Sequence, residues 1–247
     1  MKIAVAGGTG TVGRLVVERA RAMGHDAVVL SRAAGVDLRD RATVDRALTG
    51  VDAVVDAASV GTMDAVTSTE FFQAASGTLL DAAASAGVGH AVLLSIVGID
   101  RNPHGYYAGK VLQEQMFEDS TVPWSILRAT QFHEFAGQVA AQARLGPLQL
   151  APRARVRPVA AAEVAARVVE LAVAGAQGRV SDLAGPCEER LDQMIRTWVR
   201  HSGSRRPVIP VSIPGAQMRG MREGLALPGA GATIAGPTFE EWLSARG

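Results

Sequence analysis

Tyr106 and Lys110 are the two side chains of this sequence whose types and spacing best suit acid–base chemistry. They are four residues apart in a segment that predicts a helix, so they share one helix face. A phenol beside an ammonium has a lowered pKa and can act as an acid or a base at a carbonyl or an alcohol. Ser95 comes eleven residues before Tyr106 and could orient the same oxygen atom. We therefore expect Tyr106, Lys110 and Ser95 to be catalytic.

Each of these roles has a simpler structural alternative. Lys110 could be an exposed helix charge that pairs with Glu114 at the i,i+4 spacing. Tyr107 competes with Tyr106, because it lies about 100° further round the helix. We expect Tyr107 to contact the substrate, and the sequence leaves open which tyrosine faces the reacting atoms.

A glycine-rich stretch near the N-terminus predicts a site for the phosphates of a dinucleotide. It follows a short apolar run, and an amphipathic segment comes after it. Gly7 allows a sharp turn, Gly10 allows close approach to a pyrophosphate, and Gly13 lets the helix pack on the strand. The start of the helix adds free N–H groups and the positive end of a dipole. The alternative is a glycine-rich turn without a ligand. The residues that we expect to bind the cofactor here are Gly7, Thr9, Gly10, Thr11, Val12 and Gly13.

The end of the second predicted strand, 27–30, indicates which dinucleotide is bound. Ser31 and Arg32 follow this strand, where such a fold holds the adenosine ribose. A carboxylate there would bind the 2′-hydroxyl of NAD, whereas an arginine favours the 2′-phosphate of NADP. Asp26 precedes the strand and lies at its wrong end. We therefore expect NADP rather than NAD, with Ser31 and Arg32 as ligands; alternatively, Arg32 is a solvated loop charge.

Further cofactor contacts are expected where other predicted strands end, because ligands of parallel sheets collect beyond the carboxyl ends of the strands. A third strand is predicted over 35–40, a fourth over 51–58 and a sixth within 121–135. Alternatively, Asp40 or Thr43 simply caps the next predicted helix, 44–48. Lys110 would hold the nicotinamide ribose. The contacts expected from these segments are Asp37, Leu38, Ala57, Ala58, Ser59, Thr130 and Lys110.

The order of the elements predicts the fold class. Five strands up to residue 98 alternate with helices, and the fifth, 90–98, is nearly all apolar, as in a strand buried on both faces. The alternation implies right-handed crossovers and a parallel sheet. We expect an α/β protein with a Rossmann-type, doubly wound parallel sheet and a small C-terminal substrate lobe. The predicted domains are a dinucleotide-binding core, 1–135 and 155–184, and a substrate lobe, 136–154 and 185–247.

The lobe and the loop before it are expected to select the substrate. Met218 lies in an amphipathic segment and could line a pocket, because thioethers adapt to varied shapes, or it could belong to the lobe core. His133 follows the sixth predicted strand and could contact the substrate, or it could be a packed structural residue. We assign Met218, His133 and Tyr107 to substrate binding.

The composition excludes several classes of function. The chain has 247 residues, and 48% of them are hydrophobic, which supplies a core for one domain with an extra lobe. A net charge of +1 does not favour nucleic acid or an anionic membrane as a partner. One cysteine provides neither a disulfide framework nor a cysteine metal cluster. The sequence shows no leader peptide and no apolar run that spans a membrane. We expect a cytoplasmic monomer or homodimer that binds a small-molecule substrate and no metal.

Four motifs of this sequence belong together. They are Gly7-Gly8-Thr9-Gly10-Thr11-Val12-Gly13, Leu94-Ser95-Ile96-Val97-Gly98-Ile99-Asp100, Tyr106-Tyr107-x-x-Lys110 and Leu127-Arg128-Ala129-Thr130-Gln131-Phe132. Together they resemble the atypical short-chain dehydrogenases of the NmrA-like, NAD(P)-binding group, and the resemblance extends over essentially the whole chain. By this resemblance, the residues on cofactor positions are Gly7, Gly10, Gly13, Arg32 and Lys110.

The resemblance also implies a function. The group contains reductases of quinones and other carbonyl compounds, so we expect an NADP-dependent oxidoreductase acting on a fairly apolar small molecule. It also contains catalytically silent redox sensors that bind the dinucleotide. Ile96 stands where many relatives carry a second serine, and this departure supports the sensor as an alternative. A third possibility is an isomerase, cyclase or dehydratase that retains its cofactor.

Overall fold

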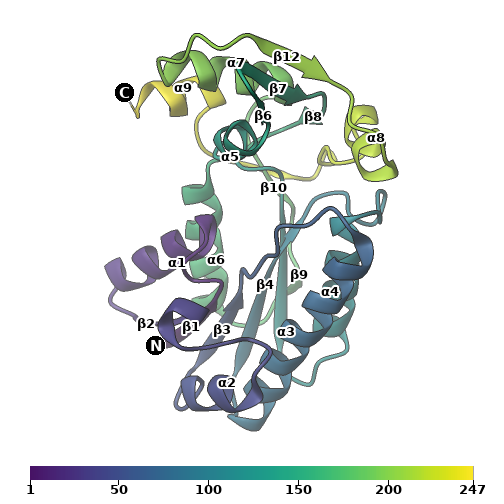
Figure 1. Ribbon diagram of the computed structural model, residues 1–247. Helices are drawn as coiled ribbons and strands as arrows, with labels where there is room; N and C mark the ends of the chain where they lie inside the picture. The colour runs from purple at the N-terminus through teal and green to yellow at the C-terminus, as the bar shows by residue number, and fades with distance from the viewer. Residues whose placement is uncertain (247) are drawn as a thin grey trace.

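The computed structural model describes residues 1–246 and has a sheet of eight strands at its centre (Figure 1). Every strand pair of this sheet is parallel. In spatial order the strands are β2 (Asp26–Leu30), β1 (Lys2–Ala6), β3 (Ala53–Asp56), β4 (His90–Ile96), β5 (Trp124–Ala129), β10 (Leu183–Ala184) and β13 (Thr233–Ile234), with β9 (Gly178–Arg179) also paired to β5.

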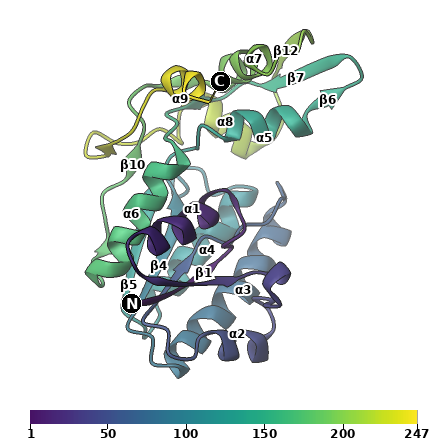
Figure 2. The same cartoon turned by 90° about the vertical axis from the view of Figure 1, so that its left-hand side faces the viewer.

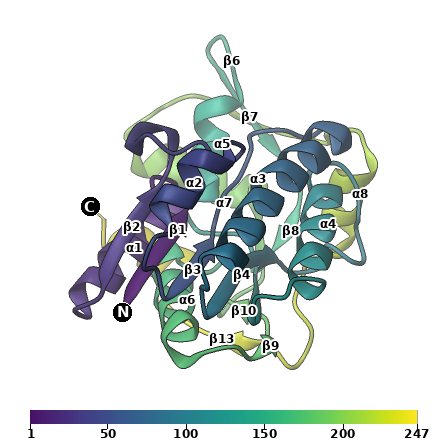
Figure 3. The ribbon, with the colours of Figure 1, turned by 90° about the horizontal axis from the view of Figure 1, so that it is seen from below.

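Helices cover both faces of the sheet (Figures 2 and 3). Because side chains alternate along a strand, Ile3 and Val5 of β1 pack with one helix layer, whereas Ala4 and Ala6 pack with the other. This two-sided burial explains why the strands are almost continuously apolar. The predicted Rossmann-type doubly wound fold is confirmed. One layer consists of α1 (Thr11–Ala22) and α6 (Ala161–Ala174), and the other of α2 (Arg41–Ala47), α3 (Ala65–Ser85) and α4 (Tyr106–Glu118).

The prediction of a strand over 35–40 is wrong. Residues Arg32–Ala34 form a turn of 3₁₀ helix (η1), which the Ser31 hydroxyl caps by accepting a hydrogen bond from the Ala34 N–H. Gly35 then adopts a left-handed φ of +79°, which turns the chain away from the edge of β2. Asp40 caps α2 by accepting a hydrogen bond from the Ala42 N–H at 3.0 Å, which is the alternative stated above.

A smaller lobe packs over one end of the sheet (Figure 1). Its apolar core includes Ala136, Leu191, Met221 and Trp242. Within residues 1–246, no helix has the length and apolarity that a bilayer-spanning segment requires. The lobe elements are α5 (Phe135–Gln142), β6 (Arg144–Leu145), β7 (Leu148–Pro152), β8 (Arg155–Val156), β11 (Glu189–Arg190), α7 (Leu191–His201), β12 (Val208–Val211), α8 (Ala216–Glu223) and α9 (Phe239–Ser244).

The C-terminal segment does not stay within the lobe. Its strand β13 pairs with β10 of the main sheet, and the Thr233 N–H donates to the Asp182 carbonyl oxygen at 2.8 Å. These residues lie inside 185–247, the range predicted for the lobe, so the two parts of the molecule interleave here. The sequence offered only two β-branched residues in a glycine- and alanine-rich stretch, which is too short for a periodic signal.

Candidate dinucleotide-binding site

The glycine turn lies where the order of the sheet reverses. The chain runs from β1 to β2 on one side and later returns to β3 on the other, so β1 and β3 are adjacent. Gly7, directly after β1, has a φ of +71°, and a Cβ there would lie 2.7 Å from the carbonyl oxygen of Ala57 after β3. Ligands of open α/β sheets bind in the crevice at such a switch point. The sharp turn predicted at Gly7 is therefore confirmed.

The start of α1 is packed closely against this turn. A Cβ on Gly13 would overlap the carbonyl oxygen of Gly7, so only glycine fits there. Helix α1 begins at Thr11, and no side chain caps its N-terminus and no acidic residue occupies its first turn. Its N–H groups and dipole are consequently available to an anion. Thr11 accepts a hydrogen bond from Gln138 of α5 at 2.8 Å, and Val12 is buried in the core.

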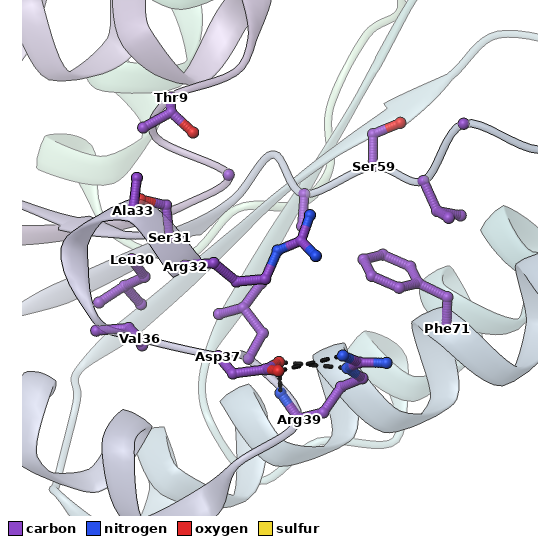
Figure 4. A pocket seen from close by; sticks show the side chains of 15 residues that line it. Thr9, Leu30, Ser31, Arg32, Ala33, Val36, Asp37, Arg39, Ser59 and Phe71 are labelled. Carbon is purple, nitrogen blue, oxygen red and sulfur yellow. Dashed lines mark hydrogen bonds and ion pairs between the residues drawn. The ribbon is translucent and has the colours of Figure 1, made fainter.

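A cavity of about 520 Å³ continues from the glycine turn along the ends of β2 and β3 (Figure 4). Eight of the residues predicted to contact the cofactor line it. Ala57 is not among the lining residues, although its carbonyl oxygen lies close to the lining residue Gly7. The predicted residues that line the cavity are Gly7, Thr9, Ser31, Arg32, Asp37, Leu38, Ala58 and Ser59.

Arg32 is the cation that this cavity offers to a ligand. Its side chain extends into the cavity (Figure 4), and its guanidinium makes no ion pair or hydrogen bond with any residue of the range 1–246. Arg39 also lines the cavity, but Asp37 holds it by a bidentate contact at 3.1 and 3.3 Å. Because the Arg39 side chain lowers the pKa of Asp37, this pair stays ionised and its charges cancel. The glycine turn with the start of α1 (residues 7–13, the glycine cradle) and the free guanidinium of Arg32 fit a dinucleotide with an anionic group at its adenosine end.

Part of the cavity wall was not predicted from the sequence. Phe71, next to the fully buried core residue Phe72, is only partly buried and borders the cavity. Arg39 stands two residues after Asp37, and that spacing was the only signal for it. The lining residues that were not predicted are Leu30, Ala33, Val36, Arg39, Val60, Gly61 and Phe71.

Tyr106 lies beside this cavity at the start of α4. Its hydroxyl is 3.0 Å from Ser59 Oγ, and its N–H donates to the side chain of Gln217 from α8 at 3.1 Å. Burial raises the pKa of Tyr106 to about 12, and the hydrogen bond from Ser59 only partly opposes this. The expected lowering of its pKa by a neighbouring ammonium is wrong, because desolvation of the phenolate outweighs every stabilising contact.

Lys110 is buried on the same helix, with 3% of its surface exposed. Its ammonium donates to the Leu94 carbonyl oxygen at 2.8 Å and to the Gln113 side chain. Burial lowers the pKa of Lys110 to about 8, although Asp56 and Glu114 act in the opposite direction. The alternative of an exposed Lys110–Glu114 pair is wrong, because Glu114 is buried and binds Arg128 and Arg179, each at 2.7 Å.

Two other predicted residues, Ser95 and Thr130, are buried in the protein interior. Ser95 on β4 is 1% exposed, and its hydroxyl has no hydrogen-bond partner among residues 1–246. The hydroxyl that contacts Tyr106 therefore belongs to Ser59 and not to Ser95. Thr130, after β5, donates its hydroxyl hydrogen to the Arg157 carbonyl oxygen at 2.6 Å.

The three predicted substrate contacts lie between the sheet and the lobe or inside the lobe. Tyr107 is 4% exposed, and its hydroxyl accepts from Gln131 Nε2 at 3.4 Å and lies 3.9 Å from Met221 Sδ. His133 is fully buried, contacts the Pro237 carbonyl oxygen at 3.0 Å, and packs against Trp242 with ring centroids 5.3 Å apart. Met218 belongs to the apolar core of the lobe.

The fold and the glycine cradle define a Rossmann-class dinucleotide-binding protein. A model of the NAD(P)H-binding family matches residues 7–174, and the chain belongs to this family. The resemblance to the NmrA-like, NAD(P)-binding group is thereby confirmed. No curated protein gives a significant sequence match.

Several solved structures share the fold over nearly their whole length. An NADPH-dependent quinone oxidoreductase from Escherichia coli, complexed with NADPH, is 22% identical, with 99% of each chain covered and a TM-score of 0.74. A triphenylmethane reductase from Citrobacter sp., complexed with NADP(H), is 16% identical, with 99% of each chain covered and a TM-score of 0.70. A Thermus thermophilus UDP-glucose 4-epimerase with NAD is 17% identical, covering 100% of this chain and 93% of that one, with a TM-score of 0.67.

Proposed function

We propose that this protein is an NADPH-dependent reductase that transfers a hydride to a carbonyl or quinone-like, fairly apolar small molecule. The contact between Ser59 and Tyr106 carries the proposal, because it brings an ionisable phenol to the segment that lines the cofactor cavity. The free guanidinium of Arg32 supports NADPH over NADH, since a 2′-phosphate would neutralise it. The fold shared with a quinone oxidoreductase and a triphenylmethane reductase supports the class of reaction.

Tyr106 is the proton donor in this proposal. When bound, a reduced nicotinamide would supply the hydride, and the reduced substrate would need a proton on its oxygen. With its pKa raised to about 12 by burial, the phenol of Tyr106 is fully protonated at neutral pH, so it holds a proton to donate, and it is a weaker acid than a free tyrosine. Ser59 Oγ, 3.0 Å away, orients the hydroxyl and links it to solvent at the cavity rim. We place no reaction step on Ser95, and we assign Lys110 the indirect role argued below.

The side of the site that faces the lobe suits an apolar substrate with one polar end. Tyr107 lies between Gln131 and the thioether of Met221. Gln131 Oε1 is a buried acceptor without a partner among residues 1–246. An unpaired buried acceptor is costly, so a ligand that donates a hydrogen bond there would be favoured. We propose Tyr107 and Gln131 as contacts to the substrate or to the carboxamide of the nicotinamide.

A non-catalytic redox sensor is the second candidate. It is supported by Ile96, which places an apolar side chain where a second hydroxyl would assist the reacting oxygen. In a sensor the dinucleotide would bind in the same cavity, and the protein would respond to its oxidation state without consuming it. Arg32 would have the same function in both cases.

A panel of quinones and aldehydes with NADPH separates these possibilities. A reductase oxidises NADPH in proportion to product. Tyr106→Phe should then lower kcat by about 10²–10⁴-fold, the usual contribution of a general acid, while the Kd for NADPH changes by less than about threefold. Tyr107→Phe removes the neighbouring phenol, which we place in binding and not in proton transfer, so it should change KM more than kcat.

Other outcomes contradict the reductase. A sensor would bind NADPH and NADP⁺ with different affinity and oxidise nothing in the panel. An isomerase or dehydratase would form product without net consumption of NADPH. Equal turnover by Tyr106→Phe and the parent protein would remove Tyr106 from the mechanism.

A further inference from the structure

Asp56 is a buried carboxylate at the last position of β3, directly before the segment that lines the cofactor cavity. It is 1% exposed, yet no arginine or lysine forms an ion pair with it within residues 1–246. Three neutral donors satisfy it instead. Its Oδ1 accepts from the Ala58 N–H at 3.0 Å, and its Oδ2 accepts from Ser76 Oγ at 2.7 Å and from Gln113 Nε2 at 2.9 Å.

Lys110 determines how the Gln113 amide is oriented. Because an ammonium only donates, the Gln113 oxygen must face Lys110, and its NH₂ group must then face Asp56 and Ser76. The Lys110 ammonium also donates to the Leu94 carbonyl oxygen and lies 4.9 Å from the centre of the Phe72 ring. These contacts enclose it within the α3–α4 layer and the sheet.

The effect of this network reaches the cavity through Ala58. Asp56 fixes the N–H of Ala58, and residues 58–61 form one wall of the cavity. The same segment meets Gly7 so closely that a Cβ on Gly7 would lie 2.8 Å from the Ala58 Cα. One residue further, Ser59 contacts Tyr106. A shift of the Ala58 peptide would therefore disturb the phosphate turn and the phenol together.

We propose that Asp56 is a positioning residue for the dinucleotide, and that Lys110 acts on the site through Gln113 and Asp56 instead of by touching the ribose. Asp56 connects Ser76 of α3 and Gln113 of α4 to Ala58 in the cavity wall. The proposal depends on cofactor binding, which is a property of the family, and not on the reductase reaction. It can therefore fail while the proposed function stands, and the reverse is also true.

Asp56→Asn tests the first part. The introduced asparagine can still accept a hydrogen bond from the Ala58 N–H. Its NH₂ group, however, would face the NH₂ group of Gln113, and two donors cannot form a hydrogen bond with each other. We expect the Kd for NADPH to rise about tenfold, because a buried hydrogen bond is replaced by an unsatisfied pair. Adding Gln113→Glu restores an acceptor opposite the introduced asparagine, while the new carboxylate still pairs with Lys110. The double variant should therefore return to within about threefold of the parent Kd.

Two controls separate positioning from general destabilisation. Ser125→Ala removes a buried hydroxyl on β5 that contacts His90 and Gln177, remote from the cofactor cavity. It should lower Tm without changing the Kd for NADPH. Should Asp56→Asn not fold, Ser76→Ala removes one donor to the same carboxylate and should raise the Kd by about threefold. The role of Asp56 would be overturned if the Kd for NADPH were unchanged in Asp56→Asn or, where that variant does not fold, in Ser76→Ala. It would also be overturned if the double variant Asp56→Asn/Gln113→Glu bound NADPH no more tightly than Asp56→Asn alone.

Lys110→Met tests the second part through a double-mutant cycle with Asp56→Asn. When one residue acts through another, the effects of substituting both do not add. The double variant Asp56→Asn/Lys110→Met should therefore bind NADPH with a Kd within about twofold of that of Asp56→Asn alone. If the losses of NADPH affinity in the two single variants added up in the double variant, Lys110 would act on the cofactor independently of Asp56, as a direct contact to the ribose would. That result would overturn its indirect role.

Discussion

Ser59 Oγ lies 3.0 Å from the hydroxyl of Tyr106, although 47 residues separate the two in the sequence. One belongs to the segment after β3 that lines the cofactor cavity, and the other begins α4. Gln217 from α8 fixes the same end of α4 by accepting from the Tyr106 N–H. The phenol is thus held by three parts of the chain that meet only in the folded protein, and one of them also lines the cavity that we propose for the cofactor.

The free guanidinium of Arg32 should determine the preference for NADPH. Arg32→Asp removes the cation and adds an anion, so we expect NADPH to lose about ten- to a hundredfold in affinity, the value of a charge-assisted hydrogen bond. NADH, which lacks the 2′-phosphate, should lose far less. Titration of both dinucleotides measures this. Arg46→Ala, an exposed arginine on α2 outside the cavity, is the control. Equal losses for NADPH and NADH would contradict the assignment.

The glycine cradle should not tolerate a methyl group at its closest contact. Gly13→Ala would push a Cβ onto the Gly7 carbonyl oxygen, so it should cost about 1–3 kcal/mol of stability and abolish NADPH binding. In Gly89→Ala the added Cβ would lie 3.6 Å from the Asp52 carbonyl oxygen, an ordinary contact, and little should change. Thermal unfolding with and without NADPH checks both. A Gly13→Ala protein that binds normally would show that the turn is not the phosphate site.

The carboxylate of Glu114 should be essential for docking α4 on the sheet. It is 2% exposed, and Arg128 and Arg179 both bind it at 2.7 Å. Burial alone would raise the pKa of Glu114, but the hydrogen bonds and charge of Arg128 lower it. Glu114→Gln leaves Arg128 without its buried partner, so we expect a loss of about 3–5 kcal/mol in urea unfolding.

Glu118 provides a matched comparison for this loss. It binds Arg179 at 2.7 Å on the same helix but is more exposed, so Glu118→Gln should cost less than about 1 kcal/mol. Similar costs for the two variants would mean that the buried ion pairs contribute no more than surface ones.

The titration of Lys110 should make stability depend on pH in alkaline solution. Its pKa is 10.5 when unperturbed and about 8 in the folded protein, because burial disfavours the ammonium. Between these values the unfolded chain binds the extra proton, so the free energy of unfolding rises with pH. Relative to Lys110→Met, the parent protein should gain up to about 3 kcal/mol between pH 8 and pH 10.5. A difference that stays constant over this interval would show that Lys110 titrates normally.

The parts of the site that depend on local spacing were predictable from the sequence. Gly7 directly follows β1 and Gly13 lies in the first turn of α1, while Arg32 comes two residues after the end of β2, so their places follow from the pattern of strand, turn and helix. The strand predicted over 35–40 was wrong because its apolar residues, Val36 and Leu38, pack on the core without a strand partner.

Residues that depend on tertiary contacts could not be predicted in this way. Asp56 meets Ser76 and Gln113 across 20 and 57 residues of sequence, and no periodicity records such a pairing. For the same reason the sequence predicted Ser95 as the hydroxyl that orients the reacting oxygen and Ser59 only as a cofactor contact, whereas the fold places Ser59 beside the phenol of Tyr106.

Transfer of deuterium from NADPH that carries it at both C4 positions of the nicotinamide tests the central claim most directly. In a single turnover by the parent protein, one deuterium should leave the dinucleotide, and with an aldehyde or ketone substrate it should appear on the reduced carbon. Tyr106→Phe, with NADPH bound equally well, should transfer it far more slowly. Retention of all the label on the dinucleotide, in a protein that binds both NADPH and the substrate, would contradict a reductase.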